Sequence, residues 1–164
     1  MLNLFYMKKT RIKILNTYID NITLEETVDF ICNAIKNGEQ HHHVVVNAAK
    51  MVASNNNTVL RQIINNCDII NADGQSVVWA SRILGKPLKE RVAGIDVMQE
   101  LVKKVSTEGY KIFLLGAKEK VVSKVANIYS KKYSPETIAG YRNGYFTKPQ
   151  EQDIAKEISE SESN

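Results

Sequence analysis

The residue whose type and position best suit catalysis is Asp73, an aspartate followed directly by Gly74. Both come after residues 67–71, a largely apolar run that predicts a β-strand. A carboxylate at a strand end can be held in a cleft, partly shielded from water, where it accepts a proton from an attacking hydroxyl group. An Asp-Gly pair is also typical of an ordinary turn or a helix start. The pair alone therefore leaves a general base and a structural turn open as alternatives.

Three other charged residues bear on this choice. Asp68 lies within the same predicted strand, and Asp96 lies near a predicted helix start, where a carboxylate more commonly serves as a cap. Arg91 lies in a loop predicted over residues 84–94, which we expect to be exposed and close to a site. Its planar guanidinium can clamp a diphosphate, although the spacing fits a solvated surface arginine equally well.

Residue types that bind metals or sugars occur in unfavourable patterns. The histidines at residues 41–43 are adjacent, so an extended chain sends neighbouring rings to opposite sides and makes a poor metal cage. Cys32 and Cys67 have no partner at metal-ligand spacing, which argues against a zinc site and a disulfide scaffold. Trp79 is predicted to lie in the core or against a partner rather than beneath a sugar ring.

Composition narrows the class of protein. A chain of 164 residues with 43% apolar residues can bury a full core, and its length predicts a single domain over residues 1–164. The 22 basic and 18 acidic residues are spread along the chain without nucleic-acid-binding signatures, so we expect no nucleic-acid partner. The apolar runs are too short to cross a bilayer, and residues 1–6 lack the features of a secretory leader. These observations favour a cytoplasmic protein.

Helical and strand patterns alternate along the sequence. Capping boxes start predicted helices at Thr23 and Thr147. We expect helices at about 24–36, within 48–65, and at 77–84, 95–108, 117–132 and after 150, and strands at 44–46, 67–71, 111–115 and 137–139. This order predicts an α/β class, a layered Rossmann-like domain with a mostly parallel sheet flanked by helices.

In such sheets ligands bind beyond the carboxyl ends of the strands, where loops diverge and helix amino termini offer free N–H groups. This rule selects Asn47, Asp73 with Gly74, Gly116 with Ala117, and the loop at residues 140–144. Gly116 lets a backbone pass close to a phosphate, but the further glycines of a dinucleotide fingerprint and a Gly-Lys-Ser/Thr phosphate loop are missing.

Five sequence segments, taken in order, resemble the WecG/TagA/CpsF glycosyltransferases, and the resemblance spans about residues 14–146. The segments are Val46-Asn47-Ala48, Asn71-Ala72-Asp73-Gly74, the run from Pro87 to Asp96, Phe113-Leu114-Leu115-Gly116 and the run from Gly140 to Phe146. Each segment is weak alone, whereas the ordered set is specific.

The resemblance implies transfer of N-acetylmannosamine or a related hexose from a UDP-sugar to undecaprenyl-diphosphate-linked N-acetylglucosamine. It implies an inverting reaction without a metal or other cofactor, serving teichoic acid or another surface polysaccharide. Asp73 matches the family's candidate general base. The residues that the resemblance places near substrate are Asn47, Gly74, Arg91, Gly116, Gly144 and Tyr145.

Two departures from the family pattern qualify this expectation. The teichoic-acid branch commonly has a threonine two positions before the asparagine, where this chain has Val45. The family also continues with another strand, a Gly-x-Pro-x-Gln-Glu element and a basic segment that engages the membrane, and this sequence contains none of them. We nevertheless expect a peripheral protein at the inner face of the membrane and a homo-oligomer.

Two other function classes stay open at this stage. A layered α/β fold also suits a dehydrogenase or a methyltransferase, because fold class does not determine function. A non-catalytic binding module would fit the missing family segment and the lack of a second obvious acid or base.

Overall fold

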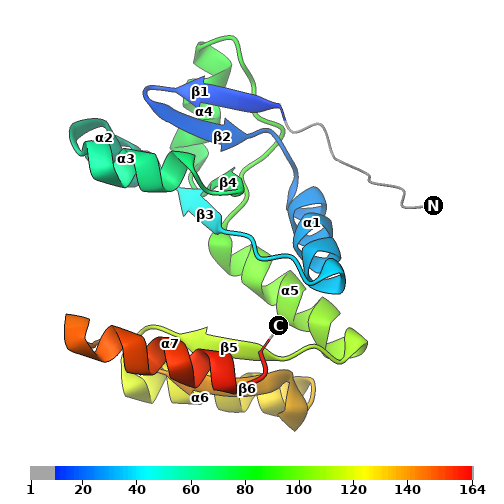
Figure 1. The fold of residues 1–164 in the computed structure, drawn as a ribbon. Coiled ribbons are helices and arrows are strands. Elements are labelled where there is room, and N and C mark those ends of the chain that lie inside the picture. Colours follow the sequence, from blue (N-terminus) through cyan, green and yellow to red (C-terminus); the bar gives the residue numbers. More distant parts are fainter. Residues whose placement is uncertain (1–9, 164) are drawn as a thin grey trace. The chain divides into compact units, whose positions relative to one another are not determined.

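Helices and strands alternate along the chain in a computed structural model that describes residues 10–163 (Figure 1). Their contacts group them into two compact units, Met1–Met98 and Gln99–Asn164. Helix α5 (Gly94–Glu108) contains the boundary between the units. The predicted absence of a secretory leader concerns residues 1–6, which lie outside the described residues.

The first unit combines a hairpin with a parallel strand pair. Besides the start of α5, its elements are β1 (Arg11–Ile14), β2 (Thr17–Asp20), α1 (Leu24–Asn37), β3 (His43–Val46), α2 (Ala48–Asn56), α3 (Thr58–Asn65), β4 (Ile69–Ala72) and α4 (Gln75–Ile83). The hairpin consists of β1 and β2, and the parallel pair of β3 and β4. Strands β3 and β4 are parallel, with His43 opposite Ile69 and Val46 opposite Ala72. This register brings the residues that follow the two strands, Asn47 and Asp73, to the same edge.

Apolar burial holds the first unit together. All four residues of β4 are buried, as is usual for a parallel strand covered on both faces. Val46 and Ile70 are wholly inaccessible and join a core that also contains Ile19 of the hairpin and Val78 of α4. The strand pair is therefore a fixed base for the loops beyond it.

A buried polar chain links α1 to this strand pair. The side-chain amide of Asn71 in β4 donates to Thr27 Oγ1 over 3.1 Å, and that hydroxyl donates to the carbonyl of Thr23 over 2.8 Å. His43 Nε2 lies 2.8 Å from Asn71 Oδ1. Each buried polar group thus has a partner, which offsets the cost of removing it from water.

The hairpin of β1 and β2 was not expected from the sequence. It is tied to β4 by Asp20, whose buried carboxylate accepts from the backbone N–H of Ile70 over 2.8 Å and from Arg11 Nε over 3.0 Å. Arg11 also donates to the carbonyl of Cys67 over 2.8 Å. The hairpin therefore extends the first unit through side-chain bonds beside β4.

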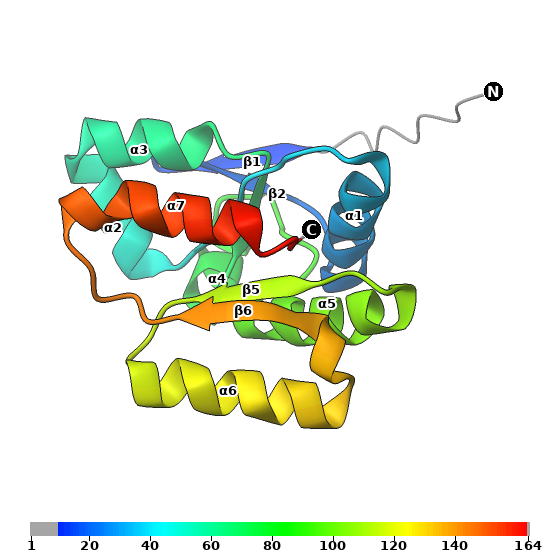
Figure 2. The same ribbon diagram turned by 60° about the horizontal axis from the view of Figure 1, so that its bottom comes forward.

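The second unit is built on one parallel pair, β5 (Ile112–Leu115) with β6 (Ile138–Arg142). Figure 2 shows α6 (Glu119–Lys132) and α7 (Glu151–Glu160) on opposite sides of this pair, and short 3-10 turns lie at Pro135–Thr137 and Lys148–Gln150. A side chain at Gly140 would place Cβ 2.6 Å from Cε2 of Phe113, so any larger residue would force that ring to move.

The structure confirms the α/β class, with parallel strand pairs flanked by helices, and both predicted capping boxes. One detail was wrong. Asp68 precedes β4 instead of lying in it, and its carboxylate accepts from the N–H of His42 over 2.8 Å. Trp79 is 58% exposed on α4, which excludes the core and retains the partner-facing alternative of its prediction. Within residues 10–163, no helix is long and apolar enough to span a bilayer.

Candidate active site

Asn47, Asp73 and Gly74 come together at the carboxyl edge of β3 and β4. The N–H of Asp73 donates to the carbonyl of Val46 over 2.8 Å, which continues the strand pairing up to the aspartate. Asn47 caps α2, because its side chain accepts from the N–H of Lys50 over 2.9 Å. A Cβ added to Gly74 would lie 3.6 Å from that of Asn47, so the two loops run side by side.

Arg91 reaches the same edge from the following loop. Its Nη1 lies 3.8 Å from Asp73 Oδ1, and its Nη2 lies 3.3 Å from Asp96 Oδ2. The three side chains retain between 32% and 44% of their exposure, so water and a ligand can reach them. The first unit thus presents one cation between two carboxylates beside Asn47 and Gly74.

Hydrogen bonds from its backbone N–H groups hold the loop that carries Arg91 in place. The side chain of Asn21 accepts from the N–H of Lys89 over 2.8 Å, and the hydroxyl of Ser81 accepts from the N–H of Leu88 over 3.0 Å. Beyond Arg91, the N–H of Val92 donates to the carbonyl of Ala72 over 2.9 Å. Most of residues 84–94 are exposed, as predicted, whereas Leu88, Val92 and Ala93 are buried and anchor the loop.

The amino terminus of α1 provides a second attachment for this loop. The N–H of Leu24 donates to the carboxylate of Glu90 over 2.6 Å. Lys89 Nζ lies 2.7 Å from the carboxylate of Glu26, the residue that completes the capping box with Thr23. The hydrogen bond from Lys89, followed by that from the N–H of Thr23, keeps the pKa of Glu26 below its usual value.

Sequence reasoning missed two features of this edge. Asp96 was interpreted as a helix cap, whereas its carboxylate faces Arg91 from the first turn of α5. Lys50 was not considered, and its Nζ donates to the carbonyl of Val45 over 2.8 Å. The available signal was the short separation of Arg91 and Asp96, five residues apart across a helix start.

Gly116, Gly144 and Tyr145 come together in the second unit, at the carboxyl ends of β5 and β6. The N–H of Gly116 donates to the carbonyl of Arg142, and the N–H of Gly144 donates to that of Ala117, each over 3.0 Å. A Cβ added to Gly144 would lie 3.0 Å from the Cα of Gly116. Tyr145 follows this close approach and is 70% exposed.

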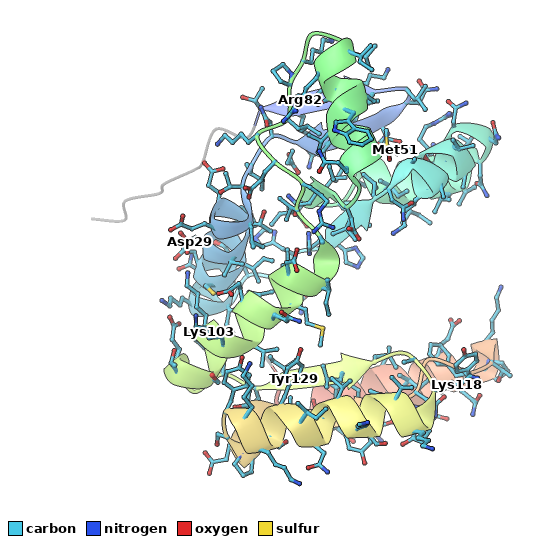
Figure 3. All side chains as sticks on the ribbon, turned by 180° about the vertical axis from the view of Figure 1, so that it is seen from behind. Asp29, Met51, Arg82, Lys103, Lys118 and Tyr129 are labelled. Carbon is cyan, nitrogen blue, oxygen red and sulfur yellow. The ribbon has the colours of Figure 1, made fainter. Side chains whose placement is uncertain are left out.

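The turn after β5 has an unusual backbone. Gly116 has φ +144°, and Ala117 has φ +57°, a left-handed conformation that costs energy for a residue with a side chain. Lys118 follows at the start of α6, where Figure 3 shows its side chain among the exposed ones at that helix end. The second unit therefore places the exposed Lys118 directly after this turn, at the amino end of α6.

Comparison with known proteins assigns the chain. The sequence model of the Glycosyl transferase WecG/TagA/CpsF family matches residues 12–164. The chain belongs to this family. The resemblance derived from its five sequence segments is thereby confirmed.

Three similar curated proteins share the name N-acetylglucosaminyldiphosphoundecaprenol N-acetyl-beta-D-mannosaminyltransferase. That of Bacillus spizizenii is 31% identical over 99 residues, 60% of this chain and 38% of that protein. That of Bacillus subtilis is 37% identical over 83 residues, 51% of this chain and 32% of that protein. That of Staphylococcus aureus is 29% identical over 137 residues, 82% of this chain and 54% of that protein. The chain thus spans about half or less of the length of these relatives.

Val45 gives this family member an apolar residue where the resemblance leads us to expect threonine. The residue is half-buried in β3, and a Cβ added to Gly94 would lie 3.2 Å from its Cγ2. Its methyl groups therefore pack against the first residue of α5. The close contact places that helix start beside the edge that carries Asn47.

The histidine run makes structural contacts. His41 lies between the carboxylates of Glu39 and Asp68, and the bond to Glu39 in particular raises its pKa. His43 faces Asn71, and burial lowers its pKa. Within the described part of the chain, no three His, Cys, Asp or Glu side chains are grouped as metal ligands. Metal independence stays a prediction.

Proposed function

We propose that the protein is a glycosyltransferase that moves N-acetylmannosamine or a related hexose from a UDP-sugar to undecaprenyl-diphosphate-linked N-acetylglucosamine. Its family and the names of its relatives support this proposal. The observation that carries it is the Asp73 carboxylate, which lies at the edge of the parallel pair with Arg91 3.8 Å away and Asn47 alongside.

In this proposal Asp73 is the general base. Its carboxylate takes the proton of the acceptor hydroxyl while that oxygen forms a bond to the anomeric carbon of the donor. The bond from the anomeric carbon to the diphosphate breaks, and UDP leaves with the electron pair. Attack from the side opposite the leaving group inverts the configuration. Proton release from Asp73 to water restores the carboxylate.

Arg91 balances the charge that develops on the departing diphosphate. A fixed guanidinium can stabilise this charge without a divalent cation. We assign Asn47 and Gly74 to the sugar. Gly74 has no side chain to block close approach, and Asn47 carries an amide. We assign Gly116, Gly144 and Tyr145 to substrate binding, because the family resemblance places them near substrate and Tyr145 exposes its ring.

The setting of the reaction follows from its substrates. The lipid-linked acceptor requires the protein to work at a membrane surface, so we propose peripheral association at the inner face of the cell membrane. We also propose that it assembles as a homo-oligomer and needs no metal or other cofactor.

The substitution Asp73→Asn tests the proposal, with Asp153→Asn on the exposed surface of α7 as the matched control. Loss of the base is expected to reduce transfer at least about a hundredfold. The amide has the same shape as the carboxylate, so the melting temperature and the affinity for UDP should be nearly unchanged. The control should keep full activity. Transfer that persists in Asp73→Asn contradicts the proposed base.

Ligand-dependent melting separates the other function classes. UDP should raise the melting temperature of the wild-type protein, whereas NAD and S-adenosylmethionine should not. Stabilisation by either of the latter ligands alone would favour a dehydrogenase or a methyltransferase. Stabilisation by UDP without transfer, in the protein at its natural length, would favour a binding module.

A further inference from the structure

The guanidinium of Arg91 contacts its two carboxylates unequally. Its Nη2 is within hydrogen-bond distance of Asp96, at 3.3 Å, whereas its Nη1 is 3.8 Å from Asp73 and outside that range. At 3.8 Å an ion pair exerts attraction without fixing direction, because a hydrogen bond needs a shorter and aligned contact. Asp96 is therefore the partner whose contact can orient the Arg91 guanidinium.

Asp96 is well placed to hold a flexible side chain. It lies in the first turn of α5, where its N–H donates to the carbonyl of Ala93 over 3.1 Å. Ala93 is buried, and so is Val97, the residue that follows Asp96 in the helix. A carboxylate in a first helical turn is also favoured by the helix dipole. A long arginine side chain loses much rotamer freedom when it is ordered, and a fixed partner lowers that cost upon binding.

From this geometry we infer that Asp96 is a positioning residue that holds the Arg91 guanidinium beside Asp73, ready for the diphosphate of a nucleotide-sugar. Two consequences follow. Arg91 is ordered before the ligand arrives, and its fork is kept from closing in two-point contact on the Asp73 carboxylate. The identity of the ligand rests on the proposed function, whereas the ordering of Arg91 by Asp96 does not.

The alternative role for Asp96 is purely structural, as a favourable charge at the start of α5. The two roles differ in what they do to ligands. A structural defect would weaken all ligands and lower the melting temperature. Loss of Arg91 positioning would weaken mainly ligands that carry the diphosphate, because uridine lacks the anionic group that the guanidinium binds.

The test compares the binding of UDP and of uridine to wild-type protein, Asp96→Asn and Glu100→Gln. Glu100→Gln removes one negative charge from the next turn of α5 and is the matched control. Asp96→Asn is expected to weaken UDP roughly tenfold, as one charged hydrogen bond would, and to leave uridine within about twofold. The control should bind both ligands normally. Equal weakening of UDP and uridine overturns the inference.

A double-mutant cycle shows whether Asp96 acts through Arg91. In an Arg91→Gln background, Asp96→Asn should change UDP affinity less than about twofold, because the group it positions is gone. A further tenfold loss in that background would mean that Asp96 acts independently, which contradicts the inference.

A ligand-free measurement keeps this inference separate from the proposed function. NMR relaxation of the Arg91 guanidinium should show an ordered side chain in the wild type and in Glu100→Gln, and a mobile one in Asp96→Asn. If UDP fails to bind the wild type, the proposed function fails, yet this measurement still decides whether Asp96 positions Arg91. Unchanged order in Asp96→Asn overturns the inference.

Discussion

Both parallel strand pairs end in a loop followed by a helix. The loops at one edge present side chains, whereas those at the other present backbone. Beyond β3 and β4 the chain presents side chains, with Arg91 between Asp73 and Asp96. Beyond β5 and β6 it presents backbone, with Gly144 packed on Gly116. The first edge therefore depends on charge and the second on the absence of a Cβ, although both follow from the same strand-loop-helix unit.

The largest expected effect comes from removing charge at the first edge without changing the fold. Arg91→Gln should reduce transfer about a hundredfold or more, as losing one fixed group that stabilises a developing anion does in other enzymes. Exposed ion pairs contribute little to stability, so the free energy of unfolding should change by less than about 1 kcal/mol. Steady-state kinetics and urea denaturation measure the two quantities. A large loss of stability would mean that Arg91 is structural.

The second edge should respond in the opposite way. Gly144→Ala places a methyl group 3.0 Å from the Cα of Gly116, and backbone cannot move aside as readily as a side chain. We expect a loss of about 1–3 kcal/mol in the stability of the second unit, as for other overpacked sites, together with weaker UDP binding. In Gly38→Ala the space at the Cβ is open but φ is left-handed, so this comparison variant measures backbone strain without overpacking.

Hydrogen exchange resolves which part of the chain responds. In Gly144→Ala, amides of β5 and β6 should exchange faster, whereas those of β3 and β4 should keep their protection. A uniform response in both strand pairs would show that the two units unfold together, and the contrast between the edges would then not extend to stability.

The two edges also differ in how far the sequence predicts them. Asn47 and Asp73 were expected at one edge because each follows a strand, and parallel pairing brings strand ends together. The pairing of Arg91 with Asp96 was not expected. It depends on where the loop crosses the edge, and bonds from residues distant in sequence, such as Asn21 to Lys89, decide that path.

The helices and strands show the same contrast between features set by local sequence and features set by long-range contacts. Local signals such as the Thr23 capping box correctly predicted where α1 begins. The β1–β2 hairpin escaped prediction, although Ile12 and Ile14 alternate with charged residues. Its turn contains no glycine, and Leu15 adopts a left-handed φ of +52° instead. Tertiary packing of the hairpin therefore imposes a turn that the local sequence does not announce.

The smallest effect concerns the side-chain bonds that hold the first unit together. Burial lowers the pKa of His43, so the folded state favours the neutral ring. Because the folded pKa lies below the unfolded one, the stability that neutral His43 contributes is present above about pH 6.5 and is lost as the pH falls. Wild-type protein should thus lose more stability between pH 7.5 and 5 than His43→Gln does.

His41 supplies the opposing control, because the hydrogen bond that its ring donates to the Glu39 carboxylate raises its pKa. Its contribution is present at low pH and is lost as the pH rises through the folded pKa, so His41→Gln should remove stability mainly near pH 5. Urea unfolding followed by the fluorescence of Trp79, the single tryptophan, reports the first unit. If His43→Gln and the wild type lose equal stability on acidification, the buried chain through Asn71 does not couple protonation to folding. Protonation of His43 would then have no part in holding the first unit together.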